Sequence, residues 1–249
     1  MNDIISETKD GVLQLRLNRP AKKNALTGHM YRALADNLDQ AATDDAVRAV
    51  IISAEGSDFC AGNDIFDFAQ GWSEVQAAEL EAMPVFRFLK ALTFFTKPLV
   101  AAVQGQAVGV GVTVLLHCDA VVVADDVRLN LPFLKLGLVP EAGSTLLLPQ
   151  RIGHTRAFGW MALGEVVTAS EALSLGLVNR VVAADELAAA AEAMAGRIAA
   201  LPPVAVRETK ALMRDPEALW PVVQAEGEVF RRLLTSPEAM AAFAAFMRK

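Results

Sequence analysis

The segment KPLVAAVQGQAVGVGVTVLLHCDA, residues 97–120, carries most of the information about the fold. Its apolar beginning predicts a buried strand at Leu99–Val103, and the glycine-containing residues 104–106 predict the turn that follows. The next apolar run predicts a buried helix over Val110–His117, and a further strand is expected at Ala120–Ala124. A strand, a turn, a helix and another strand in close succession are typical of an α/β protein.

Strands and helices also alternate upstream of this segment. Val12–Asn18 predicts a half-buried strand, because leucines alternate with polar residues there. Thr27–Ala42 predicts a helix capped by Thr27, and Ala46–Ser53 predicts a buried strand. After a loop up to Asp64, a helix is expected to end near Phe95, with Pro84 close to its start.

Downstream, the elements become more helical. A short strand is expected at Val127–Leu131, and Pro140-Glu141 predicts the opening of a helix. Thr168-x-x-Glu171 is a capping-box pattern, and Leu177–Val182 predicts the last strand. From Asp185 onward the pattern is helical. The sequence therefore predicts an α/β core with a C-terminal helical extension, which closes its own core or packs on a neighbouring subunit.

Composition narrows the class of protein. The chain has 249 residues, 53% of them hydrophobic, and a formal net charge of -6. This hydrophobic content excludes a disordered chain, and the absence of a basic excess argues against a nucleic-acid partner. An anionic ligand held by a few local basic groups stays compatible with the charge. The sequence contains neither a signal-peptide pattern nor a clean membrane span, so we expect a soluble, cytoplasmic protein with no membrane partner.

Few side chains have the spacing of a known catalytic or metal site. His29, His117 and His154 are far apart, so no metal is expected, and His117 is interpreted as a buried core or interface histidine. Two glycine-containing segments, Cys60–Asp64 and Gly109–Gly111, follow or precede apolar elements. Their glycines either allow tight turns and helix packing, or aim two backbone N–H groups at one point as an oxyanion hole.

Glu141 is the only acidic residue between Asp126 and Glu165, and its neighbours are apolar or small. A carboxylate in such surroundings has a raised pKa and can transfer protons near neutral pH. The alternative is a first-turn glutamate that interacts with the helix dipole.

Together, the segments DFCAGNDI (residues 58–65), KPLVAAVQGQAVGVGV (97–112) and LGLVPEAGST (136–145) resemble the crotonase, or enoyl-CoA hydratase/isomerase, superfamily. The resemblance extends over nearly the whole chain. It implies a crotonase-like spiral of ββα turns over residues 1–195, and a helical trimerisation region over 196–249. It also implies a homotrimer or a dimer of trimers, and an acyl-coenzyme A thioester as substrate. The backbone N–H groups of Asn63 and Val110 would form the oxyanion hole.

The resemblance also points to a reaction. The positions that match the two glutamates of the hydratases hold Thr113 and Phe133, and neither side chain can serve as a carboxylate base. Glu141 instead matches the catalytic glutamate of the peroxisomal-type Δ3,Δ2-enoyl-CoA isomerases. The resemblance thus implies a single-glutamate isomerase. The alternatives are an enoyl-CoA hydratase, an isomerase of a ring-containing acyl-CoA, and a non-catalytic acyl-CoA- or RNA-binding homologue.

The same resemblance implies the substrate contacts. No separate cofactor is expected, because coenzyme A is part of the substrate. Phe133 and Leu138 would be walls of the acyl pocket. The residues that match the coenzyme A-binding segments of the family are Lys22, Lys23, Ala25, Ala61, Asp64 and Ile65.

Overall fold

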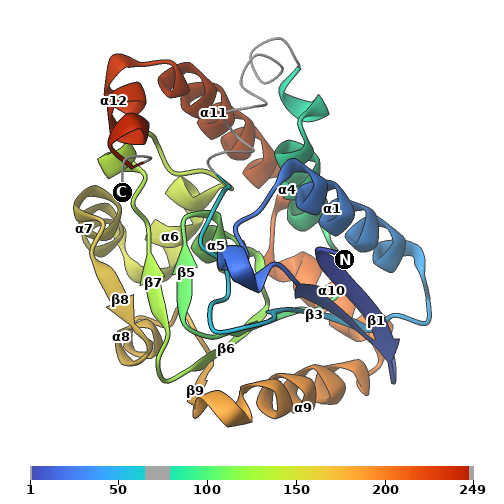
Figure 1. Cartoon of the computed structure of the whole chain (residues 1–249). Coiled ribbons are helices and arrows are strands. Elements are labelled where there is room, and N and C mark those ends of the chain that lie inside the picture. The colour runs from blue at the N-terminus through green and yellow to red at the C-terminus, as the bar shows by residue number, and fades with distance from the viewer. Residues whose placement is uncertain (1, 65–78, 247–249) are drawn as a thin grey trace.

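A computed structural model describes residues 2–64 and 79–246. Its main sheet has the strand order β1-β2-β3-β4-β6-β9, in which β1 is antiparallel to β2 and the other neighbours are parallel. A smaller sheet has the order β5-β7-β8 (Figure 1). The strands of the main sheet are β1 (Ile4–Lys9), β2 (Val12–Leu17), β3 (Ala49–Ala54), β4 (Leu99–Val103), β6 (Ala120–Ala124) and β9 (Arg180–Val182). Those of the smaller sheet are β5 (Gln106–Val108), β7 (Arg128–Asn130) and β8 (Val166–Thr168).

Helices surround the two sheets and make up most of the C-terminal part of the chain (Figure 1). The α-helices are α1 (Gly28–Thr43), α4 (Pro84–Phe94), α5 (Val110–Thr113), α6 (Ser144–Ile152), α7 (His154–Leu163), α8 (Ala169–Ser174), α9 (Leu187–Ala199), α10 (Pro203–Met213), α11 (Pro216–Leu234) and α12 (Pro237–Phe246). Short 3-10 helices are η1 (Pro20–Lys22), η2 (Leu80–Ala82), η3 (Val114–His117), η4 (Leu134–Leu136) and η5 (Ala184–Glu186).

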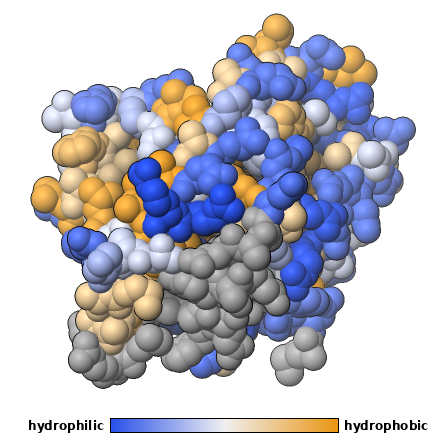
Figure 2. Space-filling view, turned by 90° about the horizontal axis from the view of Figure 1, so that it is seen from above, coloured by the Kyte–Doolittle hydropathy of each residue, from blue (hydrophilic) through white to orange (hydrophobic). Residues whose placement is uncertain are grey.

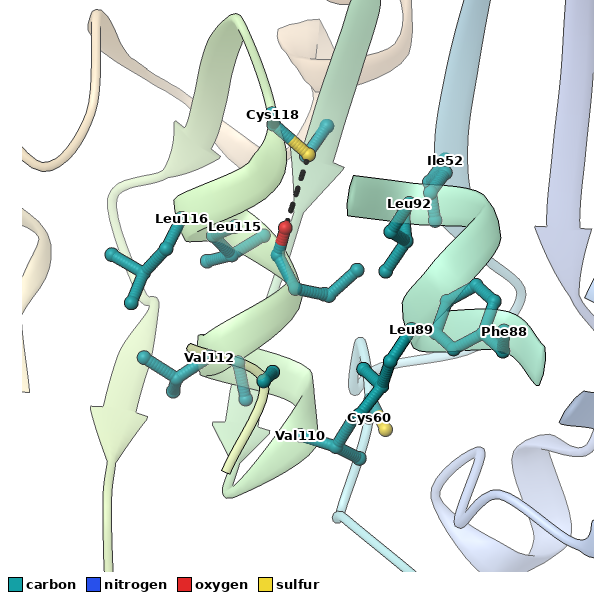
Figure 3. Close-up of a cluster of buried hydrophobic side chains, with 14 of the residues drawn as sticks. Ile52, Cys60, Phe88, Leu89, Leu92, Val110, Val112, Leu115, Leu116 and Cys118 are labelled. Atoms are coloured by element: carbon teal, nitrogen blue, oxygen red, sulfur yellow. Dashed lines mark hydrogen bonds between the residues drawn. The ribbon is translucent and has the colours of Figure 1, made fainter. Parts of the chain in front are cut away.

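The central strands of the main sheet are buried on both faces, whereas the edge strand β1 is mostly exposed. Along β4, Val100 and Ala102 belong to a hydrophobic cluster completed by α9, whereas Leu99, Ala101 and Val103 belong to the larger cluster on the other face. That larger cluster contains residues of α1, α4, α5 and η3. Figure 3 shows its residues from α4, α5 and η3. Burial of both faces explains why the strands from β3 to β6 read as nearly continuous apolar runs.

The elements expected within residues 97–120 are present, with two differences. The predicted turn contains the short strand β5, and the predicted helix is split into α5 and η3. β5 pairs in parallel with β7, a strand that lies about twenty residues further along the chain. Three residues are too few to show a periodicity, so only this long-range pairing defines the strand.

The expected helix start at Pro140-Glu141 is wrong. Ala142 has φ 64° and Gly143 has φ 72°, so the chain is in the left-handed region there and α6 begins only at Ser144. Left-handed residues interrupt a right-handed helix. Glu141 therefore lies in a loop that precedes α6, and not in its first turn.

The C-terminal extension is helical, as expected. The expected boundary at residue 195 falls inside α9, so the division into 1–195 and 196–249 does not coincide with the end of an element. α11 packs against α4 and α6, and a side chain at Gly227 would overlap the ring of Phe86. The tail thus closes part of its own subunit's core, while its role in trimerisation stays a prediction. No helix within residues 2–64 and 79–246 is long and apolar enough to cross a membrane.

Candidate active site

A cavity lies between the loop of Glu141 and the C-terminal helix α11. Asn63 and Glu141 supply polar groups to its wall, and Arg231 of α11 is also part of the lining. The rest of the wall is mostly apolar and comes from η2, α4, α11 and the residues beside them: Leu80, Met83, Val85, Phe86, Leu89, Gly227, Phe230 and Leu234. The cavity thus combines one buried carboxylate with a hydrophobic lining, as small-molecule sites often do.

The two carboxylate oxygens of Glu141 have different surroundings. The Thr113 hydroxyl donates a hydrogen bond of 2.6 Å to Oε1, whereas Oε2 is buried and has no hydrogen-bond partner among the described residues. Burial raises the pKa of Glu141 to about 7, the Thr113 hydrogen bond opposes that increase, and the nearby Glu226 carboxylate adds to it. Near neutral pH the group is therefore present in both protonation states, as a residue that accepts and returns a proton must be.

The backbone around Asn63 and Val110 brings the two expected N–H donors to neighbouring segments. Gly109 has φ 56° immediately before α5, and a side chain at Gly111 would lie 2.8 Å from the Cys60 carbonyl oxygen. Figure 3 shows Cys60 beside Val110. The Cys60 segment also pairs with β5, because the Val108 N–H donates to the Cys60 carbonyl at 2.9 Å. These glycines are needed both for the turn and for the close approach.

Within the described part of the chain, neither N–H donor is used by the fold. Asn63 forms a bridge with Leu26, but the hydrogen bonds of that bridge involve the Gly62 carbonyl and the Asp64 N–H. Val110 is the first residue of α5, so its N–H has no intrahelical acceptor. Hydrogen bonds among the described residues leave both groups without an acceptor. The Asn63 side chain, by contrast, accepts a short hydrogen bond from the Tyr31 hydroxyl.

Two distant residues hold the loop of Glu141. His117 Nε2 lies 2.7 Å from the Ala142 carbonyl oxygen. Burial lowers the pKa of His117 to about 3, so the ring is neutral and its Nε2–H donates this bond. On the other side, the Glu226 carboxylate of α11 accepts hydrogen bonds from the Gly143 N–H at 2.6 Å and the Thr145 N–H at 2.8 Å.

Reasoning from the sequence did not identify Glu226. The signal was present, because Glu226 shares the buried face of α11 with Leu219, Trp220 and Val223. A single carboxylate on the apolar face of an amphipathic helix needs hydrogen-bond donors from elsewhere in the fold. His117 is a buried histidine, as interpreted from the sequence, and its Nδ1 has no partner among the described residues.

The segments expected to bind coenzyme A lie next to each other. The Ala61 N–H donates to the Lys23 carbonyl at 2.9 Å, and the Lys23 ammonium lies 3.7 Å from Asp58. Lys22 and Lys23 are exposed. Arg19, which the sequence analysis did not single out, bridges the two segments.

Arg19 makes this connection through one nitrogen. Its Nη1 donates to the Ala25 carbonyl at 3.0 Å and to the Asp64 carboxylate at 2.6 Å. The Asp64 side chain therefore has a structural partner within the fold. Ile65, the last residue predicted for this site, lies outside the described residues.

Phe133 and Leu138 are both buried, but neither lines the cavity of Glu141 in the described part of the chain. Phe133 packs edge-to-face against the cavity residue Phe230, with a centroid separation of 6.5 Å. Phe133 would therefore affect the shape of the cavity only by supporting the position of Phe230. Residues 2–64 and 79–246 also contain no cluster of three or more His, Cys, Asp or Glu side chains that could hold a metal ion.

A buried carboxylate, together with two backbone N–H groups that have no acceptor among the described residues, is compatible with an enzyme that stabilises an oxyanion. Comparison with known proteins agrees: the enoyl-CoA hydratase/isomerase family matches residues 7–249. The structure of Pseudomonas aeruginosa OdaA is 43% identical, with a TM-score of 0.94 and full coverage of both chains. The chain belongs to the enoyl-CoA hydratase/isomerase family, and its crotonase-like fold is confirmed.

Characterised relatives include both hydratases and isomerases. The 2,3-dehydroadipyl-CoA hydratase of Escherichia coli is 32% identical over 100% of this chain and 97% of its own length. Enoyl-CoA delta isomerase 2 of Rattus norvegicus is 35% identical over 99% of this chain and 63% of its own length. The chain is therefore an enzyme of the hydratase/isomerase superfamily, and the relatives are compatible with more than one reaction.

Proposed function

We propose that this enzyme is a Δ3,Δ2-enoyl-CoA isomerase in which Glu141 is the single acid–base residue. The observation that carries the proposal is the state of its carboxylate. One oxygen is held by Thr113, the other is buried without a partner among the described residues, and the pKa is raised to about 7. Such a group can both remove and return a proton near neutral pH.

The proposed reaction moves one proton and one double bond. Glu141 Oε2 takes a proton from C2 of a 3-enoyl thioester, and the C–H electron pair delocalises into the thioester carbonyl and the C3–C4 double bond. The dienolate oxygen accepts hydrogen bonds from the Asn63 and Val110 N–H groups, which stabilise the developing negative charge. Glu141 then returns the same proton to C4, and the new double bond lies between C2 and C3. Atoms and oxidation state are conserved, so the reaction needs no redox cofactor.

The neighbours of Glu141 favour isomerisation over two-glutamate hydration. Thr113 stands where the resemblance places one hydratase glutamate, and its hydroxyl donates a hydrogen bond to Glu141 Oε1. Phe133 stands at the other position and is packed against Phe230. Neither residue can act as a second carboxylate for holding water. The apolar wall of the cavity also disfavours water near the dienolate.

Recognition of coenzyme A is assigned to the adjoining Lys22–Ala25 and Ala61–Ile65 segments. Exposed Lys22 and Lys23 would supply positive charge for phosphate groups, while the Arg19 bridge keeps the two segments together. Assembly as a homotrimer or dimer of trimers belongs to the same proposal.

The reaction is tested with purified wild-type protein and Glu141→Gln. Each is incubated with 3-enoyl-CoA, 2-enoyl-CoA and a ring-containing unsaturated acyl-CoA, and double-bond migration and water addition are followed separately. We expect migration by the wild type, and a kcat lower by about 10² to 10⁴-fold in Glu141→Gln, because a general acid–base residue contributes on this order. Exposed Glu165 provides the matched control: Glu165→Gln should behave as wild type.

Other outcomes distinguish the alternatives. Water addition without migration would overturn the isomerase proposal in favour of a hydratase, and turnover restricted to the ring-containing substrate would favour the ring isomerase. Migration that survives Glu141→Gln would exclude Glu141 as the base. A non-catalytic RNA-binding role requires RNA affinity that falls with salt, which a titration at two salt concentrations measures.

A further inference from the structure

We infer that Glu226, on the C-terminal helix α11, is a positioning residue that sets both the location and the charge environment of the Glu141 carboxylate. The inference rests on the proposed function for its kinetic consequences, but its geometry is independent of the substrate. Glu226 is buried and lies 85 residues beyond Glu141 in the sequence.

The geometry begins with the start of α6. Gly143 precedes this helix and carries no side chain to cap it, so the first N–H groups need acceptors from elsewhere. Glu226 Oε2 accepts from the Gly143 N–H at 2.6 Å, and Oε1 accepts from the Thr145 N–H at 2.8 Å and the Thr145 hydroxyl at 2.5 Å. One carboxylate therefore caps the helix and fixes the loop two residues after Glu141.

The close packing of α11 leaves this loop little freedom. A side chain at Gly143 would lie 2.5 Å from Leu219 Cδ1 and 3.3 Å from Val223 Cγ2, both on α11. Ala142, between Glu141 and Gly143, is left-handed, and its carbonyl oxygen is held by His117. The peptide groups that follow Glu141 are thus held from two sides, by η3 and by α11.

Only a carboxylate fits these donors. The two backbone N–H groups donate to different oxygens of Glu226, and the Thr145 hydroxyl is a third donor. Glutamine has one carbonyl oxygen and one NH₂ group, so Glu226→Gln would place a donor against a backbone donor. The substitution retains the size of the side chain while removing one acceptor and the charge.

When ionised, Glu226 is also the negative charge that raises the pKa of Glu141. Burial raises the pKa of Glu226 itself, and the hydrogen bonds from Thr145 and Gly143 oppose that increase. The groups that face Glu141 come from several elements. They include Tyr31 of α1, Thr113 of α5, Arg231 of α11, and Cys60 in the loop after β3. Burial raises the pKa of Cys60 to about 12 and raises that of Tyr31 well above its usual range, so both are neutral. His117, behind Ala142, is neutral as well. Arg231 is ion-paired with Glu228 at 2.7 Å.

Two substitutions near Glu141 should therefore shift its titration in opposite directions. Removing the Glu226 charge lowers the pKa of Glu141, whereas Thr113→Val removes a hydrogen bond that lowers this pKa and so raises it. Activity needs the ionised base, so the acidic limb of kcat/KM should move to lower pH in Glu226→Gln and to higher pH in Thr113→Val. Exposed Glu217, on the same helix α11, is the matched control, and Glu217→Gln should leave the limb unchanged.

The experiment measures pH profiles, kcat and KM for these variants with 3-enoyl-CoA. For Glu226→Gln we expect kcat to fall about 10 to 100-fold and KM to change less than about threefold, as is typical when a misplaced group leaves binding intact. In parallel, the carboxyl ¹³C shift of Glu141, assigned by its absence in Glu141→Gln, is titrated without substrate. This second readout tests the inference even if the wild type proves not to catalyse isomerisation.

The outcomes are separable. A wild type that moves no double bond refutes the proposed function alone, and the ¹³C titration then decides on Glu226. A Glu226→Gln variant with unchanged kcat and an unshifted limb, or an unshifted Glu141 signal, overturns the inference. If Glu226→Gln does not fold, Thr145→Val removes only one donor from Glu226. We then expect kcat to fall about 2 to 10-fold, and wild-type kinetics in that variant would contradict the inference.

Discussion

The two carboxylate oxygens of Glu141 lie in different environments. Its Oε1 accepts a hydrogen bond from Thr113, whereas Oε2 faces no donor among the described residues. Burial is the main reason that the pKa rises to about 7. The same burial that makes the carboxylate a base near neutral pH destabilises the folded protein once that carboxylate is ionised.

This cost leads to a prediction for Glu141→Gln. The folded-state pKa is raised from 4.5 to about 7, so the native state retains a proton that the unfolded state loses. The stability contributed by the protonated carboxyl is complete below about pH 4.5 and is lost as the pH rises through 7. Because glutamine stays neutral, Glu141→Gln should be more stable than wild type at pH 8, by about 3 kcal/mol.

Urea unfolding at pH 5 and pH 8 measures this difference. The gain should fall to about 1 kcal/mol or less at pH 5, because the folded wild type is then almost fully protonated while the unfolded chain is only partly ionised. A control at exposed Glu165 should show no pH-dependent gain. An equal stability of Glu141→Gln and wild type at pH 8 would contradict a raised pKa for Glu141.

Single residues differed in how far they could be predicted from the sequence. Glu141 stood out because it is isolated among apolar residues, and the structure places it in a cavity with Asn63. Arg19 and Glu226 did not stand out, because their partners lie 45 residues away at Asp64 and more than 80 residues away at Gly143 and Thr145. The apolar face of α11 indicates that Glu226 needs donors, but contacts of this range leave no local pattern that identifies the partners.

At the scale of elements, α5 and the Cys60 segment form a unit that depends on the absence of a side chain. Gly111 lies in α5, and an added methyl group would meet the Cys60 carbonyl at 2.8 Å and the Cys60 Cβ at 2.9 Å. The two segments carry Val110 and Asn63. Their separation therefore determines whether the two N–H groups can reach the same oxygen.

We predict that Gly111→Ala separates these segments. Unfolding should require about 1 to 3 kcal/mol less free energy because of overpacking, and kcat/KM should fall at least about 10-fold through the displaced donor. Thermal unfolding and steady-state kinetics measure the two effects. The matched control is Gly159→Ala in α7, where the methyl group meets nothing within 4 Å and should stabilise the helix by about 0.5 to 1 kcal/mol. Full activity in Gly111→Ala would refute this role.

Elements with a strong local signal were predicted well, and those defined by distant partners were not. Thr27 caps α1, and Thr168 with Glu171 forms the capping box of α8, both as the sequence indicated. The helix start at Pro140 was wrong because the left-handed residues Ala142 and Gly143 are stabilised by His117 and Glu226. A proline followed by a glutamate has the composition of a helix start, and only tertiary contacts delay the helix to Ser144.

For the molecule as a whole, the C-terminal helices have different environments. α11 is partly buried within the subunit, whereas α10 has no buried residue, and its Leu212 and Met213 are 88% and 80% exposed. Figure 2 looks onto the end of the molecule where α11 and α12 lie, and hydrophobic residues reach the surface there among polar ones. A contiguous group of exposed apolar residues can mark a contact surface, which makes the adjacent Leu212 and Met213 a site to test.

We predict that α10 contributes to subunit assembly. Light scattering should give the wild type a mass of three or six times 26.6 kDa. The double substitution Leu212→Lys with Met213→Lys places two charges on the exposed apolar pair and should reduce the mass of the assembly. Asp185→Lys, in the exposed η5, is the control and should leave the mass unchanged. An unaltered mass in the double variant would remove α10 from the interface.

The carboxylate that caps α6 has a consequence for synthesis of the protein. The chain emerges from the ribosome with its N-terminal part first, so the sheet strands and the loop of Glu141 leave the exit tunnel before α11 does. Until Glu226 arrives, the N–H groups of Gly143 and Thr145 lack their acceptor, and Glu141 lacks a fixed position. On the proposed function, the site would therefore be completed only at the end of translation. A chain released before α11 would contain all nine described strands and would lack the carboxylate that holds the proposed base.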